Sequence, residues 1–338
     1  MDTSSRSLLA ICSGGVIALT ALILVLEPTS RAFALVLDRD EGQGNTTAPE
    51  DDPGWRNVGS HLGSPSVVYL GNRWILTADH VGASIVIFEE KRYDPVAGSL
   101  THLKNPDGTQ ADLLLFQINE HLELPMLVIA ESPPAIGEHV ILVAAGRSRG
   151  ERLSAHLEGD SLIDGFSWKE DRTKRWGSNI IETAPKSIEQ AATKTEAVAM
   201  FFDRIEAPRG TENEGSAARG DSGGAVFARA DAMNPDSAWV LSGILFSVGT
   251  RAGYPEESSF YGDITWAADL SYYRDQIIEV VGPANTNHEG ARQNLSQGPS
   301  APKNIPIEIL AAATLFFLIG IVSWRIRINL RHGLHTDR

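Results

Sequence analysis

Hydrophobic residues follow different patterns in the middle of the chain and toward its end. Short apolar or alternating runs, bounded by turn residues, dominate from 58 to 145 and again from 222 to 266. Such runs are typical of β-strands, and the clearest lie at 66–70, 73–77 and 239–247. Helical spacing of apolar residues is confined to 267–281, where Leu270, Tyr273, Ile277 and Val281 recur. The pattern predicts an all-β body followed by one helix.

Both ends of the chain carry longer apolar runs. Residues 8–26 are almost wholly apolar and are followed by Ala32-Phe33-Ala34, which predicts a secretory signal peptide over 1–34 with a cut after Ala34. An uncleaved signal anchor is the alternative, because the run is long for a signal peptide.

The second long run predicts a transmembrane helix over 305–324, and the basic residues of 325–338 predict a cytoplasmic tail. A buried C-terminal helix or a sorting signal that is later removed would be alternatives. Residues 35–54 and 283–304 have linker-like compositions, which leaves 55–282 as the folded unit. We therefore expect a membrane-anchored protein whose folded domain is extracytoplasmic, in the periplasm or at the cell surface.

Composition narrows the classes of partner and cofactor. The 338-residue chain has a net charge of −14, which argues against nucleic-acid binding because that needs a basic face. The single cysteine, Cys12, lies in the first apolar run and excludes an intramolecular disulfide. Paired-cysteine, HExxH and glycine-rich nucleotide motifs are missing, so we expect neither a metal nor an organic cofactor.

The most informative segment is Gly-Asp-Ser-Gly-Gly at 220–224. It places Ser222 on a glycine-flanked turn, where a hydroxyl is accessible and backbone N–H groups can converge. A nucleophilic serine with a preformed oxyanion site requires this arrangement.

Two further residues have surroundings that suit the base and the acid of a nucleophilic serine. His80 follows the predicted hairpin of 66–77, and Asp112 opens the strongly apolar run 111–118. An acid that enters a buried strand needs a partner, which an imidazole N–H provides. Taken singly, His80 is also compatible with a structural histidine and Asp112 with a turn cap.

Together, these segments resemble the trypsin-like serine proteases of the chymotrypsin fold. Residues 75–81 correspond to the family's L-T-A-A-H segment, 112–115 to D-I-A-L-L, 220–224 to G-D-S-G-G and, more weakly, 243–249 to the substrate-binding strand. The resemblance implies two packed antiparallel β-barrels and a serine endopeptidase acting on protein or peptide substrates. A catalytically impaired, protease-like binding module is the alternative.

The resemblance also implies residue roles. Ser222 would be the nucleophile, His80 the general base and Asp112 its orienting acid, while the N–H groups of Gly220 and Ser222 would form the oxyanion hole. Asp221 would hold the loop from behind through an ion pair or hydrogen bond.

Substrate binding would involve Ser216, which stands at the family's pocket-base position, together with Ser247 and Gly249. A serine at 216 favours an apolar or medium-sized side chain before the cut bond. Glu212 and Glu214 are expected to be exposed loop acids, although either could supply charge to the pocket.

The chain departs from the family pattern at two places. Asp79 replaces the usual small residue before His80. It is expected either to raise the pKa of His80 or to compete as the hydrogen-bond partner of His80. A clear activation sequence is also missing, which favours an enzyme that is competent as made.

Overall fold

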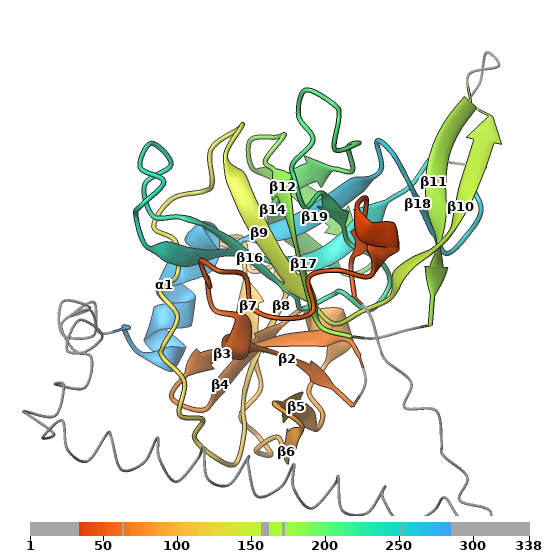
Figure 1. Ribbon diagram of the computed structural model, residues 1–338. Helices are drawn as coiled ribbons and strands as arrows, with labels where there is room; N and C mark the ends of the chain where they lie inside the picture. The colour runs from red at the N-terminus through yellow and green to blue at the C-terminus, as the bar shows by residue number, and fades with distance from the viewer. Residues whose placement is uncertain (1–33, 63, 157–161, 171–172, 252, 285–338) are drawn as a thin grey trace, which may run out of the picture. The chain divides into compact units, whose positions relative to one another are not determined.

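The computed structural model describes residues 34–284, except 63, 157–161, 171, 172 and 252. The predicted signal peptide over 1–34, apart from Ala34, lies outside these residues, as do the predicted transmembrane helix over 305–324 and the basic tail over 325–338; all three stay predictions. Within the described part, no helix is both long and apolar enough to cross a membrane. This part is mostly β-structure with a single α-helix at its end, as expected for a chymotrypsin-like fold (Figure 1).

The first large sheet contains seven antiparallel strands. In spatial order they are β6 (Lys91–Tyr93), β5 (Val86–Phe88), β2 (Val58–His61), β3 (Ser66–Gly71), β4 (Trp74–Thr77), β8 (Gln110–Gln117) and β7 (Thr101–Lys104). Asn72 and Arg73 have φ values of 49° and 68° in the turn that joins β3 to β4. The strands predicted at 66–70, 73–77 and 111–118 are confirmed.

The second large sheet also has seven antiparallel strands. Their order is β12 (Arg175–Ile180), β9 (His139–Ala144), β16 (Ala225–Arg229), β17 (Trp239–Gly249), β19 (Ile264–Asp269), β14 (Thr193–Phe201) and β13 (Lys186–Gln190). The strand predicted at 239–247 is confirmed as part of β17. The described residues thus contain two large antiparallel sheets, where the sequence predicted two packed antiparallel barrels.

Smaller elements flank the second sheet. A projecting three-stranded sheet contains β10 (Ser148–His156), β11 (Leu162–Lys169) and β18 (Ser258–Phe260), and a two-stranded sheet contains β1 (Val36–Leu37) and β15 (Gly215–Ser216) (Figure 1). Short 3₁₀ turns are η1 (Asp40–Gly42), η2 (Trp55–Asn57) and η3 (Asp79–Val81). The strands between 146 and 221 were not predicted. The sequence of β10 is rich in exposed polar residues, whereas β12 and β14 are largely buried.

Helix α1 (Leu270–Val281) begins three residues later than the predicted helix of 267–281. Ala267 and Ala268 belong instead to β19, where they pair with β14 and β17. Asp269 then ends the strand and caps the helix, since its carboxylate accepts a hydrogen bond from the Ser271 N–H. The four residues predicted to face inward, Leu270, Tyr273, Ile277 and Val281, are all buried.

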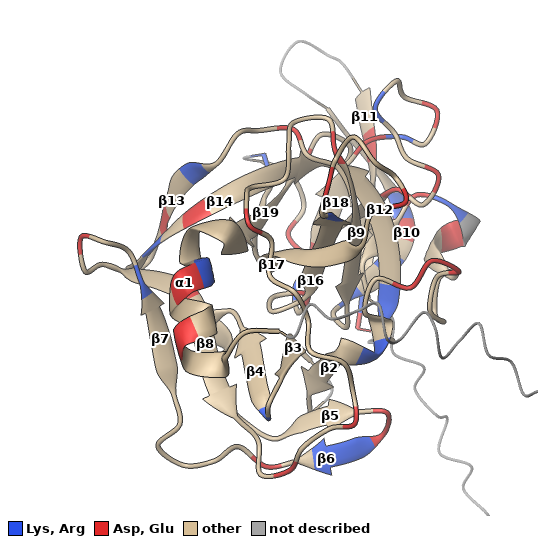
Figure 2. Ribbon diagram, turned by 90° about the vertical axis from the view of Figure 1, so that its left-hand side faces the viewer, with Lys and Arg blue, Asp and Glu red and all other residues tan. Residues whose placement is uncertain are grey.

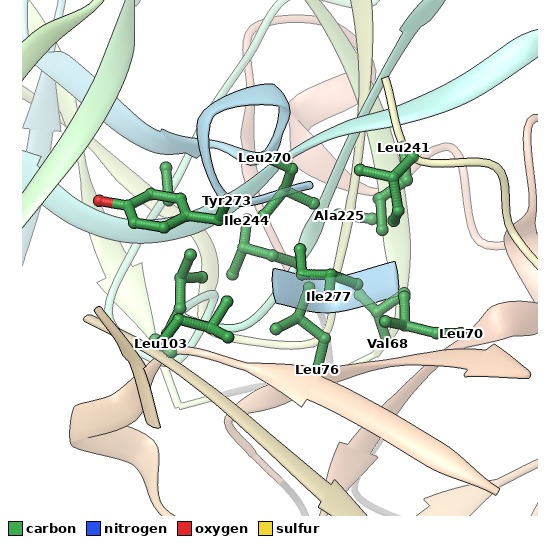
Figure 3. Close-up of a cluster of buried hydrophobic side chains, with 14 of the residues drawn as sticks. Val68, Leu70, Leu76, Leu103, Ala225, Leu241, Ile244, Leu270, Tyr273 and Ile277 are labelled. Carbon is green, nitrogen blue, oxygen red and sulfur yellow. The ribbon is translucent and has the colours of Figure 1, made fainter. Parts of the chain in front are cut away.

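One hydrophobic cluster joins both large sheets to α1 (Figure 3). It combines Val68 and Leu76 of the first sheet with Ala225 and Ile244 of the second, and Ile277 of the helix packs among them. The two sheets therefore share a continuous core beside the helix.

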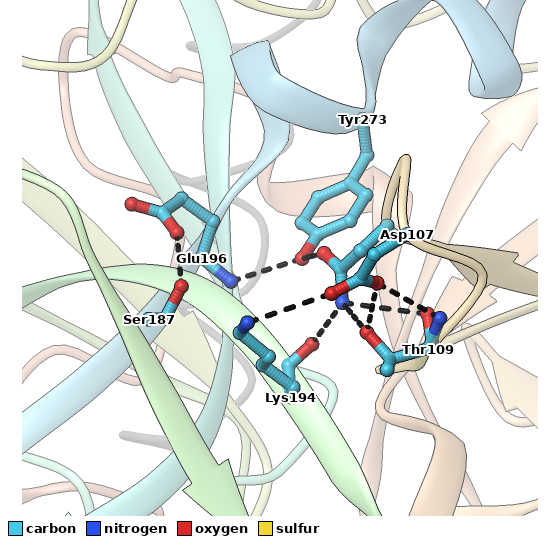
Figure 4. Close-up of polar contacts among 7 residues, drawn as sticks. Asp107, Thr109, Ser187, Lys194, Glu196 and Tyr273 are labelled. Atoms are coloured by element: carbon cyan, nitrogen blue, oxygen red, sulfur yellow. Dashed lines mark hydrogen bonds and ion pairs between the residues drawn. The ribbon is translucent and has the colours of Figure 1, made fainter.

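Polar contacts also connect the sheets at α1 (Figure 4). The Tyr273 hydroxyl donates to Asn105 Oδ1 at 2.9 Å and accepts from the Glu196 N–H at 2.9 Å. Asn105, in the turn between β7 and β8, also donates through Nδ2 to the Lys194 carbonyl of β14 at 2.6 Å. Tyr273 thus bridges a turn of the first sheet and a strand of the second.

The prediction of a flexible linker over 35–54 is wrong at its start. Residues 34–37 are fully buried, and Val36 pairs with Ser216 between β1 and β15. The segment Ala-Leu-Val-Leu is apolar, so it contributes to the core of the second sheet. Later parts of the segment are more polar. Over the described part of the chain, acidic residues are mixed with basic ones along the connecting loops (Figure 2).

Candidate active site

His80 lies at the end of the hairpin formed by β3 and β4. Strand β4 ends at Thr77, and η3 follows as a single turn closed by hydrogen bonds from Val81 N–H to Ala78 O and from Gly82 N–H to Asp79 O. About half of the His80 side chain is exposed. The turn therefore holds the imidazole on a rigid strand end while leaving one side of it accessible.

Asp112 binds His80 through both of its carboxylate oxygens. Oδ1 accepts from the His80 backbone N–H at 2.9 Å, and Oδ2 lies 2.7 Å from His80 Nδ1. The carboxylate is nearly fully buried, at 4% exposure. Because Asp112 faces Nδ1, the proton of a neutral His80 belongs on that nitrogen, and Nε2 is left as the basic atom.

The contact with Asp112 also changes the basicity of His80. The hydrogen bond that His80 donates to Asp112 raises the pKa of His80 above its ordinary value, against the opposing effect of burial. The negative charges of Asp112 and Asp79 act in the same direction. The arrangement is suited to a base that accepts a proton and is stabilised as an imidazolium.

Ser222 lies in a tight loop whose backbone packs against the first sheet. Gly223 has φ +83° and donates its N–H to the Leu245 carbonyl at 2.7 Å. A Cβ at Gly223 would lie 2.0 Å from Ser66 O and 2.2 Å from Thr77 Oγ1, so only glycine fits this approach. The Ser222 carbonyl accepts from the Ser66 N–H at 2.9 Å, which seats the loop beside the strand ends that precede His80.

Two backbone donors of this loop are unused. The N–H groups of Asp221, Gly223 and Gly224 are bound to carbonyl groups, whereas those of Gly220 and Ser222 have no acceptor among the described residues. Both Gly220 and Ser222 line the same pocket. They therefore meet the chemical requirement for oxyanion donors.

Two of the three predicted triad residues are bound directly to each other. His80 and Asp112 are hydrogen-bonded, but in the described part of the chain no hydrogen bond joins the Ser222 hydroxyl to His80. Contacts between a nucleophile and its base are often long in unliganded enzymes. The loop of Ser222 nevertheless abuts Thr77, three residues before His80.

Asp221 lies behind the loop, fully buried. Its Oδ1 accepts from the Gly146 N–H at 2.8 Å and its Oδ2 from the Ala218 N–H at 2.7 Å, and the N–H of Leu35 is a third donor. Burial raises the pKa of Asp221 to about 7. Asp221 thus holds the loop by hydrogen bonds, one of the two expected ways, and the contact with Leu35 was not predicted.

A pocket of about 520 Å³ opens beside Ser222. Its apolar and aromatic lining includes Leu245, Phe246 and Val248 of β17, with Trp168 of β11 and Tyr254 as further walls. At its edge Glu257 forms ion pairs with Arg147 at 2.6 Å and with Arg219 at 3.1 Å. Glu256 and Arg219 also line the pocket, so its lining combines apolar residues with charged ones.

The residues predicted to bind substrate are only partly found at this pocket. Ser247 lines it, and Gly249 is flanked by two lining residues without being one itself. Ser216 is enclosed in β15, where its hydroxyl lies 3.4 Å from both Ala217 O and Thr265 Oγ1, and it does not line the pocket. Ser216 pairs with Val36 of β1. The sequence had predicted that β1 belongs to a linker.

Glu212 and Glu214 also lie away from the pocket. Glu212 is an exposed acid paired with Arg39, as expected. Glu214 is fully buried, contrary to expectation, and accepts hydrogen bonds from Thr211 and Asn179. Burial raises the pKa of Glu214 to about 8.

Several residues of the site were missed by sequence reasoning. Thr195 Oγ1 accepts the Asp112 N–H at 2.9 Å and so braces the strand that carries the acid. Trp168, Tyr254 and Glu257 reach the pocket from segments without a motif, so only their place in the fold identifies them. Among the described residues, no group of three or more His, Cys, Asp or Glu side chains could hold a metal ion.

No protein-family model matches the chain, and no curated protein is significantly similar to it in sequence. Solved structures are similar to it, among them three at 13–15% identity. An inactive form of the Rv3671c protease is 13% identical with a TM-score of 0.37, and the match covers 69% of this chain and 98% of that one. Neuropsin, a serine protease of mouse brain, is 15% identical with a TM-score of 0.44, covering 70% and 98%. A mutant of human heparin binding protein is 14% identical with a TM-score of 0.44, covering 76% and 99%. All three TM-scores are below 0.5, so the assignment of the site rests on the geometry of this chain.

Proposed function

We propose that the chain is a serine endopeptidase that uses Ser222, His80 and Asp112. The observation that carries this proposal is the two-pronged contact of the buried Asp112 with the backbone and ring of His80. A buried acid that fixes the tautomer of a half-exposed imidazole leaves the other ring nitrogen free to accept a proton, as a general base must.

In the proposed reaction, Ser222 Oγ attacks the scissile carbonyl carbon while its proton passes to His80 Nε2. The tetrahedral intermediate then collapses, the C–N bond breaks, and the imidazolium gives its proton to the leaving amine. Water, deprotonated by His80, hydrolyses the resulting acyl-enzyme and restores Ser222. Asp112 stays ionised and stabilises the imidazolium throughout.

The two unused N–H groups of the loop support the same chemistry. Donors from Gly220 and Ser222 would stabilise the oxyanion, and one such donor contributes about 10²–10³-fold to the rate of acyl transfer. For the substrate, we propose a peptide with an apolar or medium-sized side chain before the cut bond. The apolar lining from Leu245, Phe246 and Val248 supports this preference.

Location is a separate part of the proposal. The apolar runs at 8–26 and 305–324 support an enzyme tethered to a membrane with its catalytic domain on the outer side. Mass spectrometry of the mature termini would show which of these segments remain, and protease accessibility of the domain in intact cells would report its side.

A protease-like binding module is the second candidate function. The observation that favours it is the lack of a hydrogen bond between Ser222 and His80 in the described residues. This module would use the same pocket to hold a peptide without cleaving it.

Labelling with a fluorophosphonate probe separates the two functions. The full chain in detergent micelles should be labelled at Ser222, and Ser222→Ala should abolish the reaction. Ser187→Ala, at an exposed serine of β13, is the matched control and should label like the wild type. Asp112→Asn should slow labelling by about 10⁴-fold, because His80 loses its orienting acid. A folded wild-type chain that never labels would favour the binding module.

A further inference from the structure

Asp79, the residue directly before His80, forms a second carboxylate–imidazole pair beside the first. Its Oδ1 lies 2.5 Å from His102 Nδ1, and its Oδ2 accepts from Gln110 Nε2 at 2.6 Å. The Asp79 side chain is 15% exposed, whereas that of His102 is 45% exposed. One imidazole and one amide therefore occupy both carboxylate oxygens.

The first sheet positions these partners. His102 is on β7, directly opposite Leu114 of β8, and Gln110 begins β8 two residues before Asp112. The two pairs, His80–Asp112 and His102–Asp79, are thus built on the same strands and joined through the peptide bond of 79 and 80. Because its oxygens are held, Asp79 does not take the place of Asp112 at His80 Nδ1.

Charge connects the two pairs. Within the described residues, the acids that act on the His80 ring are Asp112 of β8 and Asp79 of its own turn. Asp79 in turn faces His102 of β7 and the uncharged Gln110 of β8, and the other charged group on β7, Lys104, is exposed. A negative Asp79 favours a protonated His80, and a protonated His102 would offset that charge.

We propose that Asp79 is a positioning residue that acts on His80 through its charge, and that His102 and Gln110 hold its carboxylate off His80. In this arrangement the contacts of Asp79 with His102 and Gln110 set how its charge acts on the proposed catalytic base. The catalytic consequence rests on the proposed function, but the coupling between the two histidines does not.

Modification of histidines by diethyl pyrocarbonate tests the coupling without using catalysis. The reagent reacts with neutral imidazole, and mass spectrometry of peptides from the full chain resolves His80 from the other histidines. The pH midpoint of His80 modification should move to lower pH in Asp79→Asn, which removes the charge. It should move to higher pH in His102→Gln, which keeps a donor for Asp79 and cannot be charged.

Two further variants separate charge from structure. Asp79→Glu keeps the charge and should keep the wild-type midpoint, and His139→Gln, at an exposed histidine of β9, should leave it unchanged. Thermal unfolding would show that each variant is folded. Unchanged midpoints in both folded Asp79→Asn and His102→Gln would overturn the proposal.

Fluorophosphonate labelling distinguishes this result from the proposed function. If the chain is an enzyme, the acid limb of its labelling rate should move in the same direction as the His80 midpoint in each variant. Shifted midpoints in a chain that never labels would support the coupled pairs and contradict the peptidase.

Discussion

At the scale of single residues, Gly223 is the point where the candidate nucleophile loop meets the first sheet. Its φ of +83° and the missing Cβ let the loop approach Ser66 and Thr77. Gly108 has a similar φ of +84°, but no atom lies within 4 Å of the position that a Cβ would take there. The two glycines therefore have a similar φ but different surroundings.

This comparison gives a prediction. Gly108→Ala should destabilise the protein by about 1–3 kcal/mol, the cost of a left-handed conformation for alanine. Gly223→Ala should cost about 1–3 kcal/mol more, because its methyl group would also meet backbone and hydroxyl oxygens, and it should abolish labelling of Ser222. Denaturant unfolding measures both variants; equal losses of stability would show that the close approach is not important.

At the scale of elements, α1 joins the two sheets through Tyr273 and the apolar residues around it. The Tyr273 hydroxyl pairs with Asn105 and with the Glu196 N–H (Figure 4). The adjacent Tyr272 is 46% exposed. The neighbouring tyrosines provide a natural matched pair.

Tyr273→Phe should lower the free energy of unfolding by about 1–3 kcal/mol, because it leaves two polar groups without their partner. Tyr272→Phe should change it by less than about 0.5 kcal/mol. Thermal or denaturant unfolding would measure the difference. Similar values for the two variants would mean that this polar bridge does not hold the sheets together.

The elements also show what apolar periodicity predicts well. The strands around 66–77, 111–118 and 239–247 and the inward face of α1 followed from buried side chains at regular spacing. The projecting hairpin of β10 and β11 did not, because β10 is rich in polar side chains and β11 also pairs with β18, which lies far away in the sequence.

At the scale of the whole molecule, the N-terminal segment is linked to the candidate site. Leu35 is fully buried, and its N–H is a donor to Asp221, the residue before Ser222. A cut after Ala34, expected from the sequence, would convert this amide into an α-ammonium next to a buried carboxylate. Cation and anion would then form a buried pair behind the loop.

We predict that a chain starting at a free Leu35 is more stable at pH 7 than the same chain with an acetylated N-terminus. Loss of one partner of a buried ion pair costs about 3–5 kcal/mol. Thermal unfolding of the two forms measures the difference, and acetylation provides a control of equal length. Identical stabilities would contradict an ion pair at this position.

The pH dependence should differ as well. With Leu35 as an amide, burial raises the pKa of Asp221 from 3.8 to about 7. The stability contributed by this group is then complete below about pH 4 and is lost as the pH rises through 7. The acetylated form should show this loss between pH 4 and 7, and the free ammonium should reduce it by favouring the carboxylate.

The sequence by itself determined the parts of this protein that depend on local pattern. Alternating apolar residues predicted the main strands, helical spacing predicted α1, and three short motifs singled out His80, Asp112 and Ser222. Local pattern is sufficient there because side-chain period and turn residues are encoded within a few positions. The contact between His80 and Asp112 followed from the motif order and is present in the structure.

Tertiary structure alone decided which residues surround these positions. It paired Ser216 with Val36 of β1, brought Trp168 and Tyr254 to the pocket, and turned Asp79 toward His102 rather than His80. These outcomes depend on the pairing of strands distant in the chain and on the burial of apolar segments such as 34–37, which no local window records.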